Sequence, residues 1–445
     1  MIFTACALVA KRYDALMVSG MDYSTFKTAI SSSIENALKK DENNSKLRLL
    51  LDVFSEITMN LNVSSEDQSE QQRVKSLIAQ FIEWVSAISN CLNSDAWRGE
   101  DVMGIFFNEF VRYKKKSESG QVFTPEHITD FMYKILEVNK NDRVLDGTCG
   151  SGGFLVKAMA NMIREAGGPQ TEKAISIKRE QLYGIEFDRE IFALACANML
   201  IHKDGKTNLE QIDCRSVAAG KWISKQGITK VLMNPPYEQK YGCMEIVENV
   251  LNNVPAGTLC GFILPDKKLE KTSKTQINRL LNKHRLTKII KLPEDLFFGV
   301  GVTTSIFIFE TGVPQNNNEI FCCYVEDDGL ETVKNKGRHD VYGKWIVIEQ
   351  YWVDSIKKLR DDKYKTVQWI KPSEHLSYQT PVKSFEVYHE DFRKVALDYL
   401  LFQNEIEAKE FGEKLLLSVL YSSNIRENGD NINISIRKDA DYERD

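Results

Sequence analysis

The N-terminal part of the chain repeats apolar residues at helical spacing. From Phe26 to Leu38 they recur every fourth residue, so they fall on one face of a helix. Apolar residues show the same helical spacing in 47–61, 74–88 and 102–113. The pattern predicts an all-helical N-terminal domain over residues 1–116.

From residue 141 the pattern changes to short apolar runs separated by helical stretches. The runs that we interpret as strands are 143–146, 181–186, 208–213, 230–234, 258–264, 287–292 and 304–310. Strands that alternate with helices are typical of an α/β fold with a parallel, doubly wound sheet. No helix separates the last two runs, so we expect the final strand to return antiparallel. The ranges 320–325 and 345–349 predict peripheral strands.

The C-terminal part is helical again and then polar. Its helices carry an apolar stripe, made of Phe392, Val395, Tyr399, Phe402 and Ile406. We therefore predict an α/β domain with peripheral strands, a helical docking segment and a disordered tail, over 117–384, 385–423 and 424–445 respectively. Packing back onto its own domain is the alternative for the stripe.

Composition and charge exclude several classes of protein. A net charge of −5 with 42% hydrophobic residues excludes a disordered chain. No apolar run approaches the roughly 18 residues of a membrane span. The early run 2–10 lacks the preceding basic residue of a secretory signal, so we expect a cytoplasmic protein. Met21 offers an alternative start. The nine cysteines contain no C-x-x-C pair and the six histidines are scattered, so we expect no metal and no disulfide framework.

A glycine-rich turn follows the first predicted strand. The segment 146–154 reads Asp-Gly-Thr-Cys-Gly-Ser-Gly-Gly-Phe, and its glycines let the backbone pass close beneath a bound molecule. In a doubly wound sheet the ligand lies beyond the carboxyl ends of the strands. The turn departs from G-x-G-x-x-G and lacks a P-loop lysine, so a pyrophosphate is not the expected ligand.

Acidic residues end the next two strands. Glu186 could accept hydrogen bonds from two ribose hydroxyls, and Asp213 from the exocyclic amine of an adenine. With Asp146 available for a cationic amino group, these acids predict S-adenosylmethionine as the ligand. Alone, each acid could instead cap a helix or lie in a solvated loop. Asn198 and His202, one helical turn apart, are interpreted as packing or capping groups.

The fourth strand runs into Asn234-Pro235-Pro236-Tyr237, the most specific string in the chain. The prolines fix the backbone and aim the Asn234 amide oxygen and the Pro235 carbonyl at one point. The lone pair of an adenine amino nitrogen is delocalised into the ring. Two acceptors that hold the two amino hydrogens would turn this lone pair toward a sulfonium methyl group, and so favour attack by the nitrogen. Tyr237 would stack on the planar substrate. A rigid turn that caps the strand is the alternative.

These motifs resemble those of the N6-adenine DNA methyltransferases, and most closely the modification subunit of type I restriction-modification systems. The similarity spans residues 101–310 and includes the segment 120–125, Gly-Gln-Val-Phe-Thr-Pro. It implies the seven-stranded S-adenosylmethionine-dependent methyltransferase (Rossmann-like) fold, S-adenosylmethionine as methyl donor, and duplex DNA with a flipped-out adenine as substrate. The implied catalytic set is Asn234, Pro235, Pro236 and Tyr237. The implied cofactor contacts are Phe123, Thr124, Pro125, Asp146, Thr148, Gly150, Ser151, Gly152, Glu186 and Asp213.

A basic stretch offsets the acidic net charge locally. Residues 266–291 hold nine basic against two acidic residues, a net charge of 9 − 2 = +7. The stretch follows the fifth predicted strand on the ligand side of the sheet, where a phosphate backbone could pass. A solvated helix face explains it equally well. The residues predicted to bind DNA are Lys267, Lys268, Lys271 and Lys274.

We expect no target-recognition domain among the residues after 310. The resemblance implies a separate specificity subunit that reads the DNA sequence, with a second copy of this chain and a nuclease subunit as further partners. The apolar stripe is the predicted docking surface.

Two other functions fit parts of the sequence. Asn-Pro-Pro-Tyr also occurs in methyltransferases that modify a glutamine amide of release factors, because an amide nitrogen poses the same delocalisation problem. The other alternative is a non-catalytic DNA-binding or assembly subunit. The segment 120–125 and the basic stretch favour DNA, and the intact Asn234 and Asp146 favour an enzyme.

Overall fold

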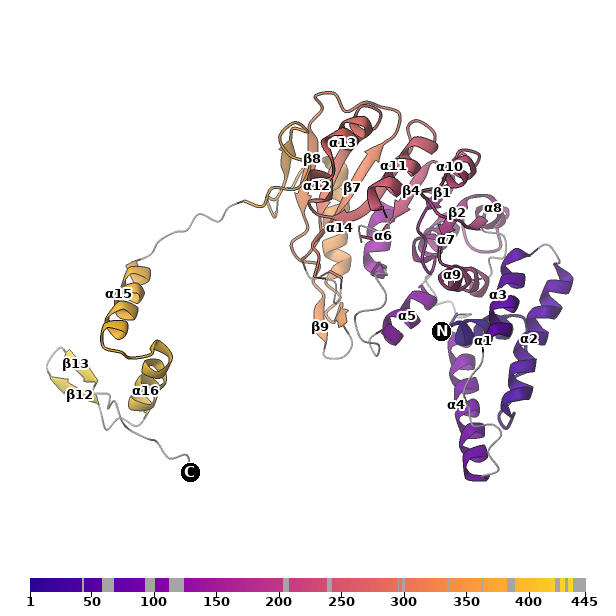
Figure 1. The fold of residues 1–445 in the computed structure, drawn as a ribbon, viewed down its shortest axis with the longest axis horizontal. Coiled ribbons are helices and arrows are strands. Elements are labelled where there is room, and N and C mark those ends of the chain that lie inside the picture. Colours follow the sequence, from indigo (N-terminus) through magenta and orange to yellow (C-terminus); the bar gives the residue numbers. More distant parts are fainter. Residues whose placement is uncertain are drawn as a thin grey trace. The chain divides into compact units, whose positions relative to one another are not determined.

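The fold divides into two compact units, Met1–Gln379 and Thr380–Asp445 (Figure 1). Among the residues that the computed structural model describes, no helix has both the length and the apolar character that a membrane span requires. The described residues are 1–41, 44–57, 68–92, 101–111, 124–202, 208–237, 242–294, 296–297, 301–333, 337–361, 363–381, 389–420, 425–428 and 431–434.

A mixed sheet forms the centre of the first unit, in the order β11-β8-β6-β7-β5-β4-β1-β2-β3. Strands β1 to β5 pair in parallel, whereas β7 runs antiparallel to both β5 and β6, which confirms the predicted return. The bounds are β1 (Val144–Asp146), β2 (Leu182–Glu186), β3 (Asn208–Gln211), β4 (Lys230–Met233), β5 (Leu259–Pro265), β6 (Arg285–Lys291), β7 (Thr304–Glu310), β8 (Ile320–Tyr324) and β11 (Gln368–Ile370). A separate hairpin joins β9 (Glu331–Val333) to β10 (Gly337–His339).

The sheet departs from the sequence prediction in two places. In the part of the chain that the structure describes it has nine strands in place of seven, because β8, which confirms the peripheral strand predicted at 320–325, and β11 extend it beyond β6. The predicted strand at 345–349 is wrong, since these residues begin helix α14 (Trp345–Lys358). Their β-branched run locally favours a strand. However, Trp345 and Trp352 are buried in the core while Ile346 is exposed, so packing on one side selects the helix.

Helices cover both faces of the sheet (Figure 1). Consecutive residues of β4 point to opposite faces: Leu232 packs in the core that contains α6, α7 and α14, whereas Val231 and Met233 pack in the core that contains α10, α11 and α13. The bounds are α6 (Glu126–Ile135), α7 (Gly153–Glu165), α8 (Glu172–Glu180), α9 (Arg189–Ile201), α10 (Val217–Ile223), α11 (Cys243–Asn253), α12 (Lys268–Lys271) and α13 (Lys274–Leu281).

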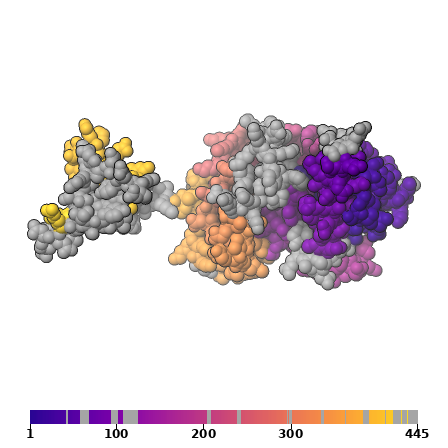
Figure 2. Space-filling view, turned by 90° about the horizontal axis from the view of Figure 1, so that it is seen from below, coloured from indigo at the N-terminus to yellow at the C-terminus, as the bar shows by residue number. Residues whose placement is uncertain are grey.

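The N-terminal helices share a core with the sheet domain. Their bounds are α1 (Ile2–Arg12), α2 (Tyr23–Lys40), α3 (Ser45–Glu56), α4 (Gln68–Leu92) and α5 (Val102–Val111). The common element is α9, which is buried continuously from Ile191 to Ile201 and packs against α1, α3 and α5. A helix that is apolar on all sides must be covered on all sides. Figure 2 shows the indigo and purple N-terminal residues directly against the rest of the unit. The boundary predicted at 116 lies outside the described residues.

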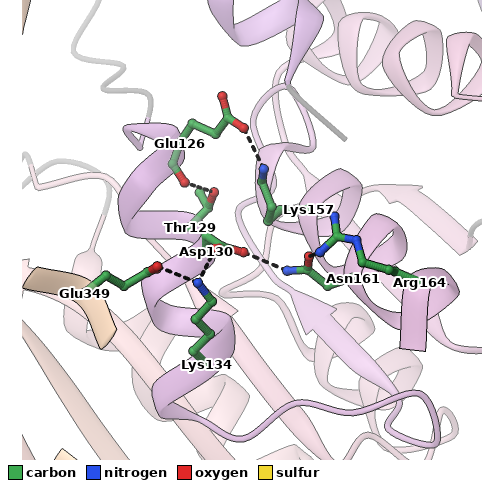
Figure 3. Close-up of polar contacts among 8 residues, drawn as sticks. All are labelled: Glu126, Thr129, Asp130, Lys134, Lys157, Asn161, Arg164 and Glu349. Atoms are coloured by element: carbon green, nitrogen blue, oxygen red, sulfur yellow. Dashed lines mark hydrogen bonds and ion pairs between the residues drawn. The ribbon is translucent and has the colours of Figure 1, made fainter. Parts of the chain in front are cut away.

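A polar network fixes helix α6 between α7 and α14 (Figure 3). The Lys134 ammonium lies 2.8 Å from Asp130 and 2.5 Å from Glu349, and Asp130 also accepts from Asn161 at 2.7 Å. At the start of α6, Lys157 Nζ contacts Glu126 Oε1 at 2.6 Å. Because α6 follows the segment that ends at 125, this network positions the chain entering the pocket described below.

The described residues of the second unit form two helices and a hairpin. Helices occupy most of the segment predicted to dock, and four of its apolar residues, Phe392, Val395, Tyr399 and Phe402, are 59–78% exposed. The tail that the sequence predicts to be disordered contains the antiparallel pair β12 and β13. The bounds are α15 (His389–Gln403), α16 (Ala408–Leu420), β12 (Ile425–Asn428) and β13 (Asn431–Ile434).

Candidate active site

A pocket lies at the carboxyl ends of β1, β2, β3 and β4. Neighbouring parallel strands end at the same edge of a sheet, so the acids and the Asn-Pro-Pro-Tyr turn come together there. Pro125 and Gly152 are outside the lining, and Phe123 lies outside the described residues. The predicted residues that line the pocket are Thr124, Asp146, Thr148, Gly150, Ser151, Glu186, Asp213, Asn234, Pro235, Pro236 and Tyr237.

The glycine-rich turn is tied closely to the end of β2. Gly150 and Gly152 have φ angles of +55° and +90°, a conformation that favours glycine. The backbone N–H of Gly150 donates to Glu186 Oε2 at 3.0 Å. Gly152 caps α7, and Gly153, the first residue of that helix, lines the pocket. The turn therefore presents backbone to any molecule bound above it.

Asp146 is a buried carboxyl group at the end of β1, only 1% exposed. It accepts a hydrogen bond from the Thr148 backbone N–H at 3.1 Å. Burial, opposed by this hydrogen bond and assisted by the nearby Glu186 charge, raises the pKa of Asp146 to about 8. A cation bound in the pocket would favour the ionised carboxylate.

Glu186 is held by three backbone N–H groups. Its Oε1 accepts from Phe187 at 2.8 Å and from Asp188 at 2.9 Å, and its Oε2 accepts from Gly150. Burial raises the pKa of Glu186, and these hydrogen bonds oppose the rise. Because Oε1 already accepts two hydrogen bonds, the remaining acceptor capacity lies mainly on Oε2 and has a defined direction at the pocket.

Asp213 lies two residues beyond β3 and forms an ion pair that the sequence analysis missed. Arg215 donates through Nη2 to Asp213 Oδ2 at 2.6 Å and through Nε to Oδ1 at 3.0 Å. The Arg215 side chain lowers the pKa of Asp213. In the described residues, no group of three or more His, Cys, Asp or Glu side chains is placed to hold a metal ion.

Asn234 lines the same pocket as Asp146 and Glu186. Its amide Nδ2 donates to Thr124 Oγ1 at 3.0 Å, and its Oδ1 accepts from the Tyr237 hydroxyl at 2.7 Å. Burial raises the pKa of Tyr237 well above its usual value, so this hydroxyl remains a donor. The Tyr237 ring meets Phe297 edge-on, with centroids 6.2 Å apart. Thr124 and Tyr237 thus orient the Asn234 amide from both ends.

Several lining residues escaped the sequence analysis. Phe187 is 65% exposed and lines the pocket beside Glu186, and Ile212 lines it beside Asp213. Phe187 directly follows the acidic residue that ends β2, and this position could have marked it as a pocket residue from the sequence. Asp101 also lines the pocket, but its partners there are 50 and 97 residues away in sequence, so no local pattern marks it.

The basic stretch lies outside the pocket lining. Three of the lysines predicted to bind DNA, Lys267, Lys271 and Lys274, are exposed, and Lys268 is half-buried. Other cations of the stretch are engaged within the fold: Arg279 pairs with Glu248, and Arg285 with Glu310. The free charge of this surface is therefore smaller than the sequence suggests.

Comparison with known proteins assigns the family. Residues 98–258 and 247–341 match the family model described as N-6 DNA Methylase. The chain belongs to this family. The match spans the pocket residues from Asp101 to Ile246, and it confirms the resemblance found in the sequence.

Two relatives show how far the similarity extends along each chain. The type II restriction enzyme and methyltransferase RM.BcgI of Heyndrickxia coagulans is 31% identical over 338 residues, which cover 70% of this chain and 51% of that protein. The type I restriction enzyme StySPI methylase subunit of Salmonella potsdam is 25% identical over 272 residues, which cover 54% of this chain and 50% of that subunit. The chain spans about half the length of each of these relatives.

Solved structures confirm the fold class. The type I restriction-modification methyltransferase subunit from Streptococcus thermophilus has a TM-score of 0.55 at 16% identity, covering 81% of this chain and 75% of that one. A chain from a study of complex assembly and conformational transition in the type I R-M system has a TM-score of 0.56 at 15% identity, covering 95% and 93%. At such identities the likeness concerns the fold alone.

Proposed function

We propose that this chain transfers a methyl group from S-adenosylmethionine to N6 of a flipped-out adenine in duplex DNA, as the modification subunit of a complex of the type I kind. One observation carries the proposal. Asn234, from the turn after β4, lines the same pocket as Asp146 and Glu186, from the ends of β1 and β2. A nucleoside held by the acids would therefore lie within reach of a base held by Asn234.

The donor set of the pocket fits S-adenosylmethionine. Asp146 would take the methionine ammonium, and Glu186 would accept from the ribose hydroxyls. Asp213 would accept from the adenine amine on Oδ2, since Oδ1 already accepts from the Arg215 backbone N–H and from Nε. Phe187 with Ile212 would flank the adenine ring. A cationic ligand suits the buried carboxyls, since it favours their charged forms. When bound, S-adenosylmethionine would supply the electrophilic methyl group.

The Asn-Pro-Pro-Tyr turn would activate the target nitrogen. Asn234 Oδ1 and the Pro235 carbonyl would accept the two amino hydrogens of the adenine and stabilise the positive charge that develops on N6. The incoming amine would replace the Tyr237 hydroxyl on Asn234 Oδ1. Tyr237 would then be released to stack on the extruded base.

Binding duplex DNA needs more surface than the pocket offers. Extruding an adenine costs a few kcal/mol. Lys267, Lys271 and Lys274, with Lys268 beside them, would contribute phosphate contacts. A specificity subunit would supply the remaining DNA-binding surface, and it would dock on the exposed stripe of α15. A second copy of this chain and a nuclease subunit would complete the assembly.

The decisive test is the product. The chain is coexpressed with the products of neighbouring reading frames in a host that lacks adenine methylation, and its DNA is digested for mass spectrometry. N6-methyladenine should appear with the wild type and be absent with Asn234→Ala, which should still bind S-adenosylmethionine. A lack of N6-methyladenine above background, or a methylated glutamine in a release factor instead, would refute the proposed substrate.

The docking surface has its own test. Phe392→Ser with Phe402→Ser should abolish copurification of the specificity subunit and leave the cofactor affinity of the chain unchanged. Undiminished copurification would show that the stripe on α15 is not the docking surface.

A further inference from the structure

Asp101 connects the N-terminal helices to the glycine-rich turn. It lies directly before α5, lines the pocket, and accepts three hydrogen bonds on its carboxylate. The backbone N–H of Gly104 and the Asn198 amide each donate to Oδ1 at 2.7 Å, and the Ser151 hydroxyl donates to Oδ2 at 2.5 Å. These donors come from α5, α9 and the turn, so one side chain joins three segments.

An ordinary helix cap accounts for only one of these bonds. An aspartate at the N-cap accepts from the N–H three residues later, as Asp101 does from Gly104. The bonds from Asn198 and Ser151 have no place in that motif. The packing is also specific, because a Cβ atom at Gly153 would lie 2.7 Å from Asp101 Oδ2. A side chain at the start of α7 would therefore have to displace the carboxylate.

Asp101 and Asn198 together clamp Ser151 at two points. Asp101 receives the Ser151 hydroxyl, and the fully buried Asn198 donates to the Ser151 carbonyl at 3.0 Å. Ser151 is 2% exposed and stands between Gly150 and Gly152, the two residues of the turn with positive φ. Glycines impose little restraint of their own. The backbone N–H groups of Cys149 and Gly150 tie the first half of the turn to β2, so the shape of the second half depends on how Ser151 is held.

We propose that Asp101 is a positioning residue which, through Ser151, holds the turn in the shape that accepts the methionine half of S-adenosylmethionine. This inference rests on the proposed function. It also assigns a role to α5: displacement of this helix would move Asp101 and loosen the turn, so cofactor binding depends on how the N-terminal helices are seated on α9. Asn198, interpreted from the sequence as a packing or capping group, is the second half of the clamp.

The test separates the clamp from the cap. Asp101→Ser keeps a good N-cap residue for α5 but is too short to serve Ser151 and Asn198 as well. Calorimetric titration of the full chain should show S-adenosylmethionine binding about tenfold more weakly, because small displacements of a binding group are costly. In methylation assays KM for the cofactor should rise by a similar factor while kcat at saturation changes less than about twofold.

A double-mutant cycle and two further variants complete the test. Ser151→Ala should also weaken binding, and the double variant should be no worse than Asp101→Ser alone, since both substitutions remove the hydrogen bond between Asp101 and Ser151. Asp101→Asn, which can still accept on Oδ1 and can donate to Ser151, should restore most of the affinity. Asp22→Ala removes an exposed cap of the same kind, on α2, and should lower thermal stability without changing KM.

The outcomes that would overturn the inference are distinct. If Asp101→Ser has unchanged affinity for S-adenosylmethionine and only a lower melting temperature, Asp101 acts solely as the N-cap of α5. Additive effects of Asp101→Ser and Ser151→Ala would remove the connection between them. If the wild-type chain itself fails to bind S-adenosylmethionine, the proposed function falls, and this inference falls with it.

Discussion

The hydroxyl of Tyr237 donates a 2.7 Å hydrogen bond to Asn234 Oδ1, the oxygen that would receive the adenine amino group. The same residue would have to supply the stacking ring. Tyr237 therefore competes with the substrate through its hydroxyl and would bind it through its ring. The two roles can be separated by mutation.

Tyr237→Phe removes the competing hydroxyl and keeps the ring. We expect kcat/KM for duplex oligonucleotides to stay the same or rise. Tyr237→Ala removes the ring, so kcat/KM should fall by an amount that corresponds to the lost stacking energy of about 1–3 kcal/mol. Steady-state methylation with both variants tests this. Equal damage in the two would show that the hydroxyl itself takes part in the reaction.

Thr124→Val removes the acceptor for Asn234 Nδ2 without changing the size of the side chain. The bond to Thr124 would still orient Asn234 after the substrate amine has replaced the Tyr237 hydroxyl, so we expect its loss to lower kcat by about 5- to 10-fold, the equivalent of one hydrogen bond of about 1 kcal/mol. Thr287→Val is a matched control, since it removes a 3.0 Å hydrogen bond to Ile308 in the sheet, away from the pocket lining. If the control also loses kcat, the fall in Thr124→Val reflects lower stability of the protein rather than a misplaced Asn234.

Cofactor binding should depend on pH through Asp146. Its pKa is raised to about 8 by burial, and a cationic ligand prefers the carboxylate. Affinity for S-adenosylmethionine should therefore rise from pH 6 to about pH 8 and level off above that. In this range, binding of the cationic ligand should release the proton from Asp146. Calorimetry in buffers of different ionisation enthalpy measures the released proton. Affinity that is flat across this range contradicts the assigned partner.

The same pKa predicts the stability of Asp146→Asn. The folded-state pKa is above the ordinary value of 3.8, so protonation favours the folded protein. This stabilisation is complete below about pH 4 and is lost as the pH rises through about 8. Asn has no proton to lose, so thermal melts should show little difference near pH 4 and a more stable variant above pH 8. A variant that is less stable at high pH would contradict the cause given for the shift.

The exposed lysines predict a salt effect. Lys271→Ala with Lys274→Ala should weaken DNA binding and reduce the slope of log K against log salt by about 0.9 for each phosphate that the variant no longer neutralises. The rate at saturating DNA should be unchanged. Lys225→Ala is the control, because Lys225 is exposed and lies just before β4 begins, at the edge opposite the pocket. Equal effects in the control would indicate a nonspecific response to net charge.

The sequence alone predicted the features that depend on neighbouring residues. Apolar runs located strands β1 to β7, and the residues at their ends had to meet because parallel strands finish at one edge. That geometry brought Asp146, Glu186 and Asn234 to one pocket without any knowledge of packing.

Tertiary structure decided what depends on distant residues. The run at 345–349 becomes a helix because its buried side chains pack on one side. Asp101 reaches Ser151 and Asn198 across 50 and 97 residues. Such contacts leave no periodic trace in the sequence, since each is set by how α5 and α9 pack rather than by the residues beside it.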